Sequence, residues 1–383
     1  MKSRTVITLW AIAILLGITA YLVKFQGNDE DTTQTQLSPG QNIIEQLPIR
    51  SITGVTLSQG DQSTQLVRLD QDGGQVWGVA ERDNYALNYE LLRNLLGALG
   101  ELEVTQGYPS SREHYGRFGL KTESDTPSDV ALRVTMTGKD GDTIAEVFLG
   151  KYSGTSRTGG RFLRITGDGS GVYAVGETFP GITASPKDWL NKEFLKIEHI
   201  QSIALSAPAD PEFKPWKLVR NPNSDGTPNP KGQFTLEGMT DQEIMKLTST
   251  NPLLNIFSYS AFKDILSEKE AATSANPDAK LKRQALITTS SGLTYTLDFW
   301  PQNEQPKDPN SDPRLPGVQP TYLLTIKVTS GNKETPAPGI FKDRIYQISQ
   351  STISPLQKKR SDFVTSKNKP SVTTPPVHAP AQR

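Results

Sequence analysis

The chain has 383 residues, of which 35% are hydrophobic, and it carries 41 basic and 41 acidic residues and no cysteine. A chain without net charge has no overall electrostatic attraction for nucleic acid, which argues against a nucleic-acid partner. The lack of cysteine excludes a disulfide framework, a thiolate metal site and a lipid anchor on cysteine. The length predicts two core-forming domains.

The N-terminus predicts a transmembrane anchor over residues 1–25. Residues 5–23 form an uncharged run rich in Leu, Ile, Ala and Val. As a helix this run would be about 28 Å long, close to the roughly 30 Å of a bilayer's hydrocarbon core. A cleaved signal peptide is the alternative, but its best cleavage site, after Ala20, places Ile18 where a small residue is expected. We therefore favour an uncleaved anchor.

Charge on the two sides of this run predicts its orientation. Lys2 and Arg4 precede it, whereas Asp29, Glu30 and Asp31 follow soon after it. By the positive-inside rule, the N-terminus stays in the cytoplasm and the bulk of the chain is exported. The sequence thus predicts a single-pass protein of the bacterial cytoplasmic membrane.

Composition divides the rest of the chain into four segments. An acidic, Thr/Gln-rich stretch reads as a polar stalk, and a basic, Pro/Thr-rich C-terminus reads as a disordered tail. Two α+β modules lie between them. The expected bounds are 26–42 for the stalk, 43–184 and 185–353 for the modules, and 354–383 for the tail.

The two modules begin alike, which predicts an internal repeat. The alternating strand at 52–58 (ITGVTLS) matches the one at 200–206 (IQSIALS). A strand with a tryptophan follows in each module. We therefore expect Trp77 and Trp216 to occupy equivalent positions.

A main helix is expected next in each module. In the first, leucines recur at helical spacing over 91–99, with Asn88 as N-cap. In the second, Thr240 and Glu243 form a capping-box pattern that predicts the matching helix.

Later strands also match between the modules. They are expected at 130–134, 144–149, 161–166 and 172–175 in the first module, and at 285–289, 295–300, 322–328 and 345–348 in the second. The predicted fold class is α+β, with two tandem repeated modules that each pack one main helix on a face of an antiparallel sheet. A short helix at 185–190 is expected to join them.

Several short motifs of the first module resemble those of a known family. They are Trp77-Gly-Val79, Phe118-Gly119-Leu120, Phe148-Leu149-Gly150, Arg161-Phe162-Leu163-Arg164 and Val172-Tyr173-Ala174-Val175, together with the leucine helix. The chain resembles an uncharacterised membrane-anchored bacterial domain often encoded beside ABC-type export permeases and gliding-motility auxiliary proteins. The resemblance implies an envelope-facing accessory role to a transporter and supplies no catalytic motif.

Catalytic patterns are sparse. His114, His199 and His378 have no paired spacing that would suit a metal. Ser260 and Ser366 each begin an S-x-x-K pattern, yet neither is accompanied by S-D-N or K-T-G. The sequence therefore predicts no enzyme, no metal site and no cofactor.

One loop is a candidate binding site. The Gly/Ser-rich stretch 150–160 holds Lys151 and Arg157, and Arg161 and Arg164 follow it. Flexible basic loops can bind phosphate or acidic glycans through backbone amides and guanidinium groups. A solvated hairpin loop is the plainer alternative.

Two functions remain open from the sequence. The first is a non-catalytic interaction or accessory protein whose partner is an envelope or transporter protein, with an ABC-type transport system as the suggested context. The second is an anchored glycan-active hydrolase or glycan-binding protein. A hydrolase would need two carboxylates about 5 to 10 Å apart in a cleft, and the sequence nominates no such pair.

Overall fold

The computed structural model describes eleven stretches of the chain. They are residues 32–33, 35–71, 74–154, 159–166, 171–229, 231–258, 260–276, 278–303, 320–330, 333–334 and 344–367. The predicted anchor at 1–25 lies outside these residues, as does the first part of the stalk. In the stretches described, no helix is both long enough and apolar enough to cross a membrane.

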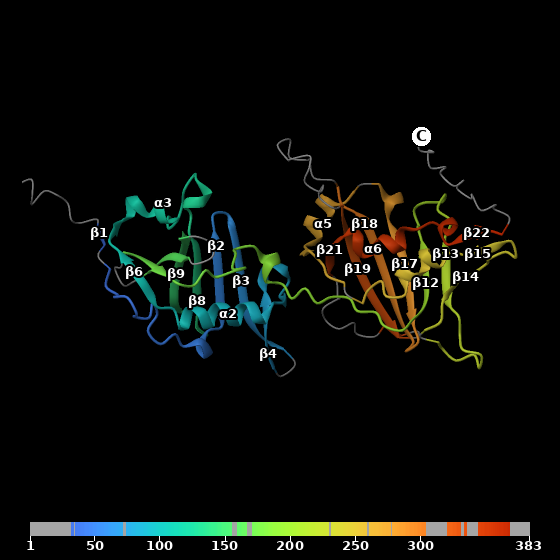
Figure 1. Ribbon diagram of the computed structural model, residues 1–383, viewed down its shortest axis with the longest axis horizontal. Coiled ribbons are helices and arrows are strands. Elements are labelled where there is room, and N and C mark those ends of the chain that lie inside the picture. The colour runs from blue at the N-terminus through green and yellow to red at the C-terminus, as the bar shows by residue number, and fades with distance from the viewer. Residues whose placement is uncertain are drawn as a thin grey trace, which may run out of the picture. The chain divides into compact units, whose positions relative to one another are not determined.

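The chain divides into two compact units, 1–189 and 190–383. The division falls at the end of the short 3-10 helix η6 (Pro186–Trp189), within the segment expected to join the modules. Each unit is built around a wide antiparallel sheet (Figure 1). The expected α+β class, with one main helix on each sheet, is wrong, because the fold is mostly β and only the first unit carries such a helix among the described residues.

The first sheet has nine strands in the order β5-β4-β3-β2-β8-β9-β10-β11-β6. Their bounds are β2 (Gly54–Gln59), β3 (Gln62–Gln71), β4 (Gly74–Val79), β5 (Tyr85–Ala86), β6 (Val104–Tyr108), β8 (Leu132–Thr137), β9 (Thr143–Ser153), β10 (Gly160–Ile165) and β11 (Val172–Val175). A separate pair joins β1 (Thr32–Thr33) to β7 (Ser110–Ser111).

The second sheet follows the order β14-β13-β12-β17-β18-β19-β21-β16, with β20 on the end of β19. Its strands are β12 (Ile200–Ser206), β13 (Trp216–Arg220), β14 (Phe234–Leu236), β16 (Asp264–Leu266), β17 (Arg283–Thr289), β18 (Leu293–Pro301), β19 (Thr321–Ser330), β20 (Lys333–Glu334) and β21 (Ile345–Ser349). When β5 is left out of the first sheet and β20 out of the second, the two sheets have the same strand order. The two units therefore share one strand plan.

Arginines at equivalent positions of the two sheets donate equivalent hydrogen bonds. Arg68 of β3 donates from Nη1 to the carbonyl oxygen of Ile52 at 3.4 Å. Arg220 of β13 donates from Nε to the carbonyl oxygen of Ile200 at 2.7 Å. Because each arginine comes two residues after the leucine that pairs with Val55 or Ile203, the two contacts occupy the same place in the strand plan.

The expected match of Trp77 with Trp216 is wrong. Trp77 lies on β4 opposite the arginine of β3, and Phe234 has this position in the second unit. Trp216 lies on β13, where the first unit has Thr64. The reason is that β3 contains no tryptophan, so matching the tryptophans skips one strand.

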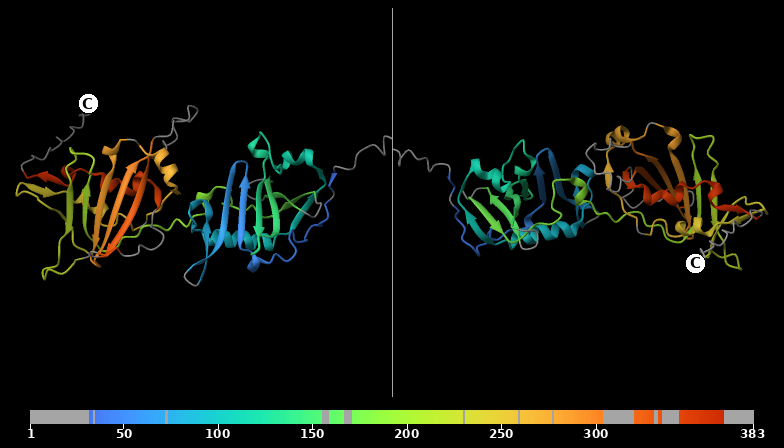
Figure 2. Two further views of the ribbon diagram at one scale, coloured as in Figure 1. Left: turned by 180° about the vertical axis from the view of Figure 1, so that it is seen from behind. Right: turned by 45° about the horizontal axis from the view of Figure 1, so that its top comes forward.

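Helix α2 (Tyr89–Gly100) covers the core face of the first sheet and runs across its strands (Figures 1 and 2). The side chain of Asn88 accepts a hydrogen bond from the backbone N–H of Leu91 at 3.2 Å, so the predicted N-cap is present. The buried side of the helix consists of Leu92, Leu95, Leu96 and Leu99. This leucine stripe is the helical part of the first core.

The second unit has no counterpart of α2 among its described residues. In its place are β15 (Glu243–Met245), α4 (Leu247–Thr250) and the 3-10 turn η7 (Asn251–Leu253). Half of the predicted capping box exists, since the N–H of Thr240 donates to Glu243 Oε2 at 2.9 Å. The chain nevertheless becomes a strand there, because β15 pairs with β22 (Val364–Ser366), and Pro252 ends the short helix.

The expected disordered tail from residue 354 does not begin there. Residues 354–367 form η9 (Ser354–Gln357), η10 (Arg360–Asp362) and β22. Leu356 and Phe363 are fully buried, and the ring of Phe363 packs 4.8 Å from that of Trp216. This segment belongs to the second core. The basic and proline residues around its two apolar side chains made its sequence resemble a disordered tail.

The leucine stripe predicts a sharp contrast between two substitutions in α2. Leu95 is 1% exposed, so Leu95→Ala should lower the free energy of unfolding by about 2 to 5 kcal/mol through the cavity that it leaves. Arg93 is exposed beside Glu90, so Arg93→Ala should change it by less than about 0.5 kcal/mol. Denaturant titration measures both values. Similar small effects from both would show that the stripe is not core.

Acid should loosen the C-terminal segment of the second unit. Hydrogen bonds from Arg360 and from the backbone of Thr240 lower the pKa of Glu243 to about 2. A carboxyl with a pKa depressed on folding adds stability above its unfolded pKa of about 4.3, and this stability is lost as the pH falls towards 2. Glu243→Gln should therefore destabilise the protein at pH 6, and its difference from the wild type should shrink towards pH 2 in denaturant titrations.

The matched control is Glu237→Gln, which removes an exposed ion pair with Lys217. We expect it to change stability little at any pH. A difference between Glu243→Gln and the wild type that stays constant from pH 6 to pH 2 would contradict this account.

Candidate functional site

Lys151, the first of the four candidate cations, holds two parts of the first unit together. It lies on β9, and its Nζ is 2.8 Å from Asp129 Oδ1 and 2.9 Å from the carbonyl oxygen of Gly116. The hydrogen bond from Lys151 holds the pKa of the Asp129 carboxyl below its usual value. The ammonium group of Lys151 thus holds the segment after β7 against the hairpin formed by β9 and β10.

Arg161 and Arg164 also use their guanidinium groups within the fold. Arg161 Nε donates to the carbonyl oxygen of Gly150 at 2.7 Å, and its guanidinium lies 5.4 Å from the Tyr152 ring centroid. The guanidinium carbon of Arg164 lies 3.5 Å from the ring centroid of Phe148. Burial lowers the pKa of both guanidinium groups.

The structure therefore gives three of the four candidates contacts that stabilise the hairpin. Arg157 lies outside the described residues. Carbonyl oxygens, rings and one carboxylate contact Lys151, Arg161 and Arg164. Their role in binding stays a prediction.

Gly119 and Gly150 explain why the motifs at 118–120 and 148–150 occur together. A Cβ built on Gly150 would lie 2.2 Å from the carbonyl oxygen of Phe118, and one on Gly119 would lie 2.7 Å from Cγ of Lys151. Gly119 also has a positive φ of 68°, which a side chain disfavours. The chain after helix α3 (Tyr115–Phe118) thus packs backbone against backbone on β9.

A small aromatic cluster forms over this contact, on the sheet face away from α2. Tyr108, Phe118 and Phe162 bring their ring centroids within 5.0 to 5.9 Å of one another. They pack against the buried side chains of Leu120, Ala131, Phe148 and Val172. Four of the motifs that carry the family resemblance, those at 118–120, 148–150, 161–164 and 172–175, therefore contribute side chains to this second, smaller core.

Beside this cluster lies a charged group that the sequence analysis missed. Glu146 of β9 accepts hydrogen bonds from Arg133 Nε at 2.6 Å and from Thr166 Oγ1 at 2.6 Å. Burial opposes ionisation of Glu146, but these bonds outweigh it and hold the pKa of the carboxyl below its usual value. The pairing of β8 with β9 would have revealed this group, since Arg133 and Glu146 come from neighbouring strands and opposite sides of the Gly138–Asp142 turn.

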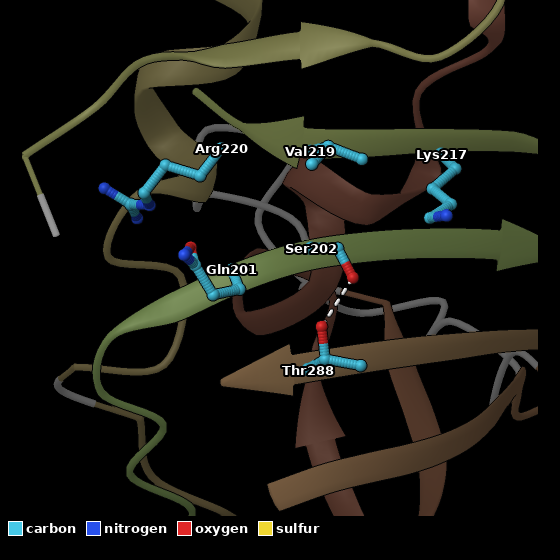
Figure 3. A pocket seen from close by; sticks show the side chains of 6 residues that line it. All are labelled: Gln201, Ser202, Lys217, Val219, Arg220 and Thr288. Atoms are coloured by element: carbon cyan, nitrogen blue, oxygen red, sulfur yellow. Dashed lines mark hydrogen bonds between the residues drawn. The ribbon is translucent and has the colours of Figure 1, made fainter. Parts of the chain in front are cut away.

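The second unit has a shallow depression of about 320 Å³ on its sheet (Figure 3). It is lined by Gln201, Ser202, Lys217, Val219, Arg220 and Thr288. The hydroxyl oxygens of Ser202 and Thr288 are 2.6 Å apart, and the guanidinium of Arg220 points away from them. None of the six lining residues is a histidine or a carboxylate, and the one lining lysine, Lys217, pairs with Glu237 at 3.3 Å.

Two of the other sequence candidates, Ser260 and His114, form hydrogen bonds within the fold, and His378 lies outside the described residues. Ser260 donates its hydroxyl to the carbonyl oxygen of Leu195, which uses the first residue of the S-x-x-K pattern. His114 Nδ1 lies 2.8 Å from Ser111 Oγ. Across the described stretches, no group of three His, Asp or Glu side chains is placed to hold a metal ion.

The backbone contact at Gly150 predicts opposite effects for two glycine substitutions. Gly150→Ala should lower the free energy of unfolding by more than about 1 kcal/mol, because the methyl group must displace the backbone of Phe118. Gly97→Ala in α2 meets no atom within 4 Å and should raise it by up to about 1 kcal/mol. Equal effects of the two substitutions in denaturant titrations would rule out the close packing at Gly150.

One family model matches the chain. It is described as "Domain of unknown function (DUF4340)" and covers residues 77–284, from β4 of the first unit to β17 of the second. No curated protein and no solved structure matches at a significant level. Because the match spans more than half of the chain, the protein belongs to the DUF4340 family.

Proposed function

We propose that the protein is a non-catalytic, membrane-anchored protein of the bacterial cell envelope that serves as an interaction or accessory subunit. The family to which it belongs is defined without a function. The proposed partner is an envelope or transporter protein, with an ABC-type transport system as the context that the motif resemblance suggests.

The observation that carries this proposal is the open face of the second sheet. Residues alternate between the two faces of a strand, so the side chain of Ser202 points away from the face that holds the buried Ile203. The residues paired with Ser202 on the adjacent strands share its outer face. On this outer face Val219 is 38% exposed and Leu286 is 41% exposed, one on each strand beside β12. The hydroxyl side chains of Ser202 and Thr288 lie near Val219 (Figure 3). A shallow surface with exposed apolar side chains suits a protein partner.

The carboxyl groups support this proposal over a glycan-active hydrolase. A glycosidase needs a carboxyl whose pKa is raised so that it can donate a proton. Among the described carboxyl groups, each one with a shifted pKa has it lowered, through partners that favour the ionised form. These groups are Asp129, Glu146, Glu198, Asp225 and Glu243.

The proposed location rests on the sequence of the first 31 residues. The apolar run at 5–23 and the charges on its two sides favour an anchor in the cytoplasmic membrane with the bulk of the chain exported. A membrane anchor raises the effective concentration of an interaction protein near a membrane partner. Attachment should therefore matter to its activity.

The test compares a soluble fragment of residues 35–367 with the anchored protein in a strain that lacks the gene. The fragment should fold but fail to restore the wild-type phenotype, and an unrelated single-span anchor should return the function. The fragment should also show no turnover of glycan or peptide substrates. Turnover that one carboxyl substitution abolishes, with the fold intact, would overturn the proposal in favour of the hydrolase.

A further inference from the structure

The ribbon of β15 and β22 turns one of its faces to solvent. Ile244 pairs with Thr365 across the ribbon. The backbone N–H of Lys367 donates to the carbonyl oxygen of Gln242 at 2.9 Å, so the antiparallel pairing continues beyond this pair. Because side chains alternate between the two faces of a strand, Lys246 and Lys367 lie on the same face of the ribbon as Ile244.

This face combines exposed apolar side chains with exposed cations. Ile244 is 47% exposed, and Leu247, the first residue of α4, is 41% exposed. The side chains of Lys246 and Lys367 are exposed, and neither forms an ion pair with a residue in the described stretches. We call Ile244, Lys246, Leu247 and Lys367 the ribbon patch.

The ribbon patch has no carboxylate on its own face of the two strands. Glu243 is the one acidic residue of β15 and β22, and it alternates with Ile244, so it lies on the opposite face. There its carboxylate accepts hydrogen bonds from Arg360 Nη1 and Nη2 at 2.8 and 3.0 Å. Asp241 and Asp362 lie in the segments before the two strands. The two lysines of the patch are therefore left to attract an anion from outside the chain.

Contacts behind the ribbon fix its position on the second core. Arg360 Nη2 also donates to the carbonyl oxygen of Gly238, just after β14, at 3.0 Å. The ring of Phe363, directly before β22, packs on that of Trp216. A surface that is already ordered loses little conformational entropy when it binds. The ribbon patch thus meets this condition for binding.

The composition of the ribbon patch suits an anionic phospholipid surface. Such a surface presents phosphate groups above an apolar interior, so it can accept apolar side chains that are flanked by cations. Lysine carries a compact, hydrated charge on a flexible stem, which can follow mobile headgroups while the stem covers apolar surface. A fixed carboxylate is matched better by the planar fork of an arginine, as Glu243 is matched by Arg360.

We propose that the ribbon patch binds the anionic phospholipid headgroups of the membrane surface. Ile244 and Leu247 enter the headgroup layer, and Lys246 and Lys367 bind phosphate groups. The choice of membrane rests on the proposed anchor and location. An anchored chain is already confined near the bilayer, so a weak contact is enough to keep the patch occupied. The second unit would then turn its β15–β22 ribbon towards the lipid.

Fluorescence of the full-length protein in lipid vesicles tests this contact, because the chain has no cysteine of its own. An environment-sensitive dye on Thr365→Cys reports on the patch and leaves its four residues in place. In vesicles that contain phosphatidylglycerol, the emission should shift to shorter wavelength, and nitroxide-labelled lipids should quench it. Vesicles of phosphatidylcholine alone should cause neither effect. The same dye on Leu286→Cys, on the open face of the second sheet, should stay in water in both.

Substitutions separate the contributions of charge and apolar surface. Lys246→Gln and Lys367→Gln should each lower the ratio of bound to free ribbon about fivefold, the usual contribution of one lysine at an anionic surface. Ile244→Ser combined with Leu247→Ser should abolish the shift in emission. Lys269→Gln, which changes an exposed lysine of α5 (Glu268–Ser274), is the matched control and should leave the ratio unchanged. Higher salt should release the ribbon from the vesicles.

Three results would overturn the proposal. They are a dye at position 365 that stays in water on phosphatidylglycerol vesicles, a contact that ignores both lysine substitutions, and lipid contact at position 286 in place of 365. A photo-crosslinker at position 365 that captures a protein in cells, while the dye stays in water on vesicles, would assign the patch to an acidic protein segment. Chain recovered outside the membrane fraction of cells would refute only the proposed anchor, because the purified protein still reports its contact with vesicles.

Discussion

In each unit, one hydrogen bond from the second strand of the sheet holds the returning chain over that sheet. In the first unit, Thr64 Oγ1 donates to the carbonyl oxygen of Ala184 at 2.7 Å. In the second, Trp216 Nε1 donates to the carbonyl oxygen of Lys358 at 2.8 Å. The two donors occupy the same register position on the second strand, and both acceptors lie after the last strand of the sheet. A buried carbonyl without a donor is costly, so the buried contact of Thr64 with Ala184 favours the return of the chain to this place in the first unit.

The two units meet this constraint with different covering elements. The first covers its sheet with α2, whose leucine stripe is long enough to form a stable helical face. The second replaces that helix by the β15–β22 ribbon and the buried side chains of Leu356 and Phe363. The two units share one strand order but cover their sheets with different elements. The fold can therefore repeat although the sequences between its strands differ.

The sequence revealed the parts of this plan that alternate clearly. The strand at 52–58 and its match at 200–206 became β2 and β12, and the leucines at 91–99 became α2. β3 went unrecognised because its buried Thr64 is polar, and β16 because it has only three residues. The helix expected after Thr240 failed because strand pairing with a segment more than 100 residues away prevailed over the local capping pattern.

The candidate site was harder to predict for a different reason. Lys151, Arg161 and Arg164 bind carbonyl oxygens, and a sequence pattern does not show which carbonyls a fold brings near. The sequence of a basic, glycine-rich hairpin is compatible with a ligand-binding loop and equally with a tightly packed turn. The glycines decide between them, since Gly119 and Gly150 leave no room for a side chain where the backbones meet.

Because Lys151, Arg161 and Arg164 are held by contacts within the fold, we propose that the protein acts through its open sheet face. The most direct measurement places a photo-crosslinking amino acid at Leu286, on the open face of the second sheet, in living cells. We expect one dominant crosslinked envelope protein from this position and much less from Tyr89, a more exposed site on the first unit. Equal, diffuse crosslinking from both positions, or none from Leu286, would contradict the account.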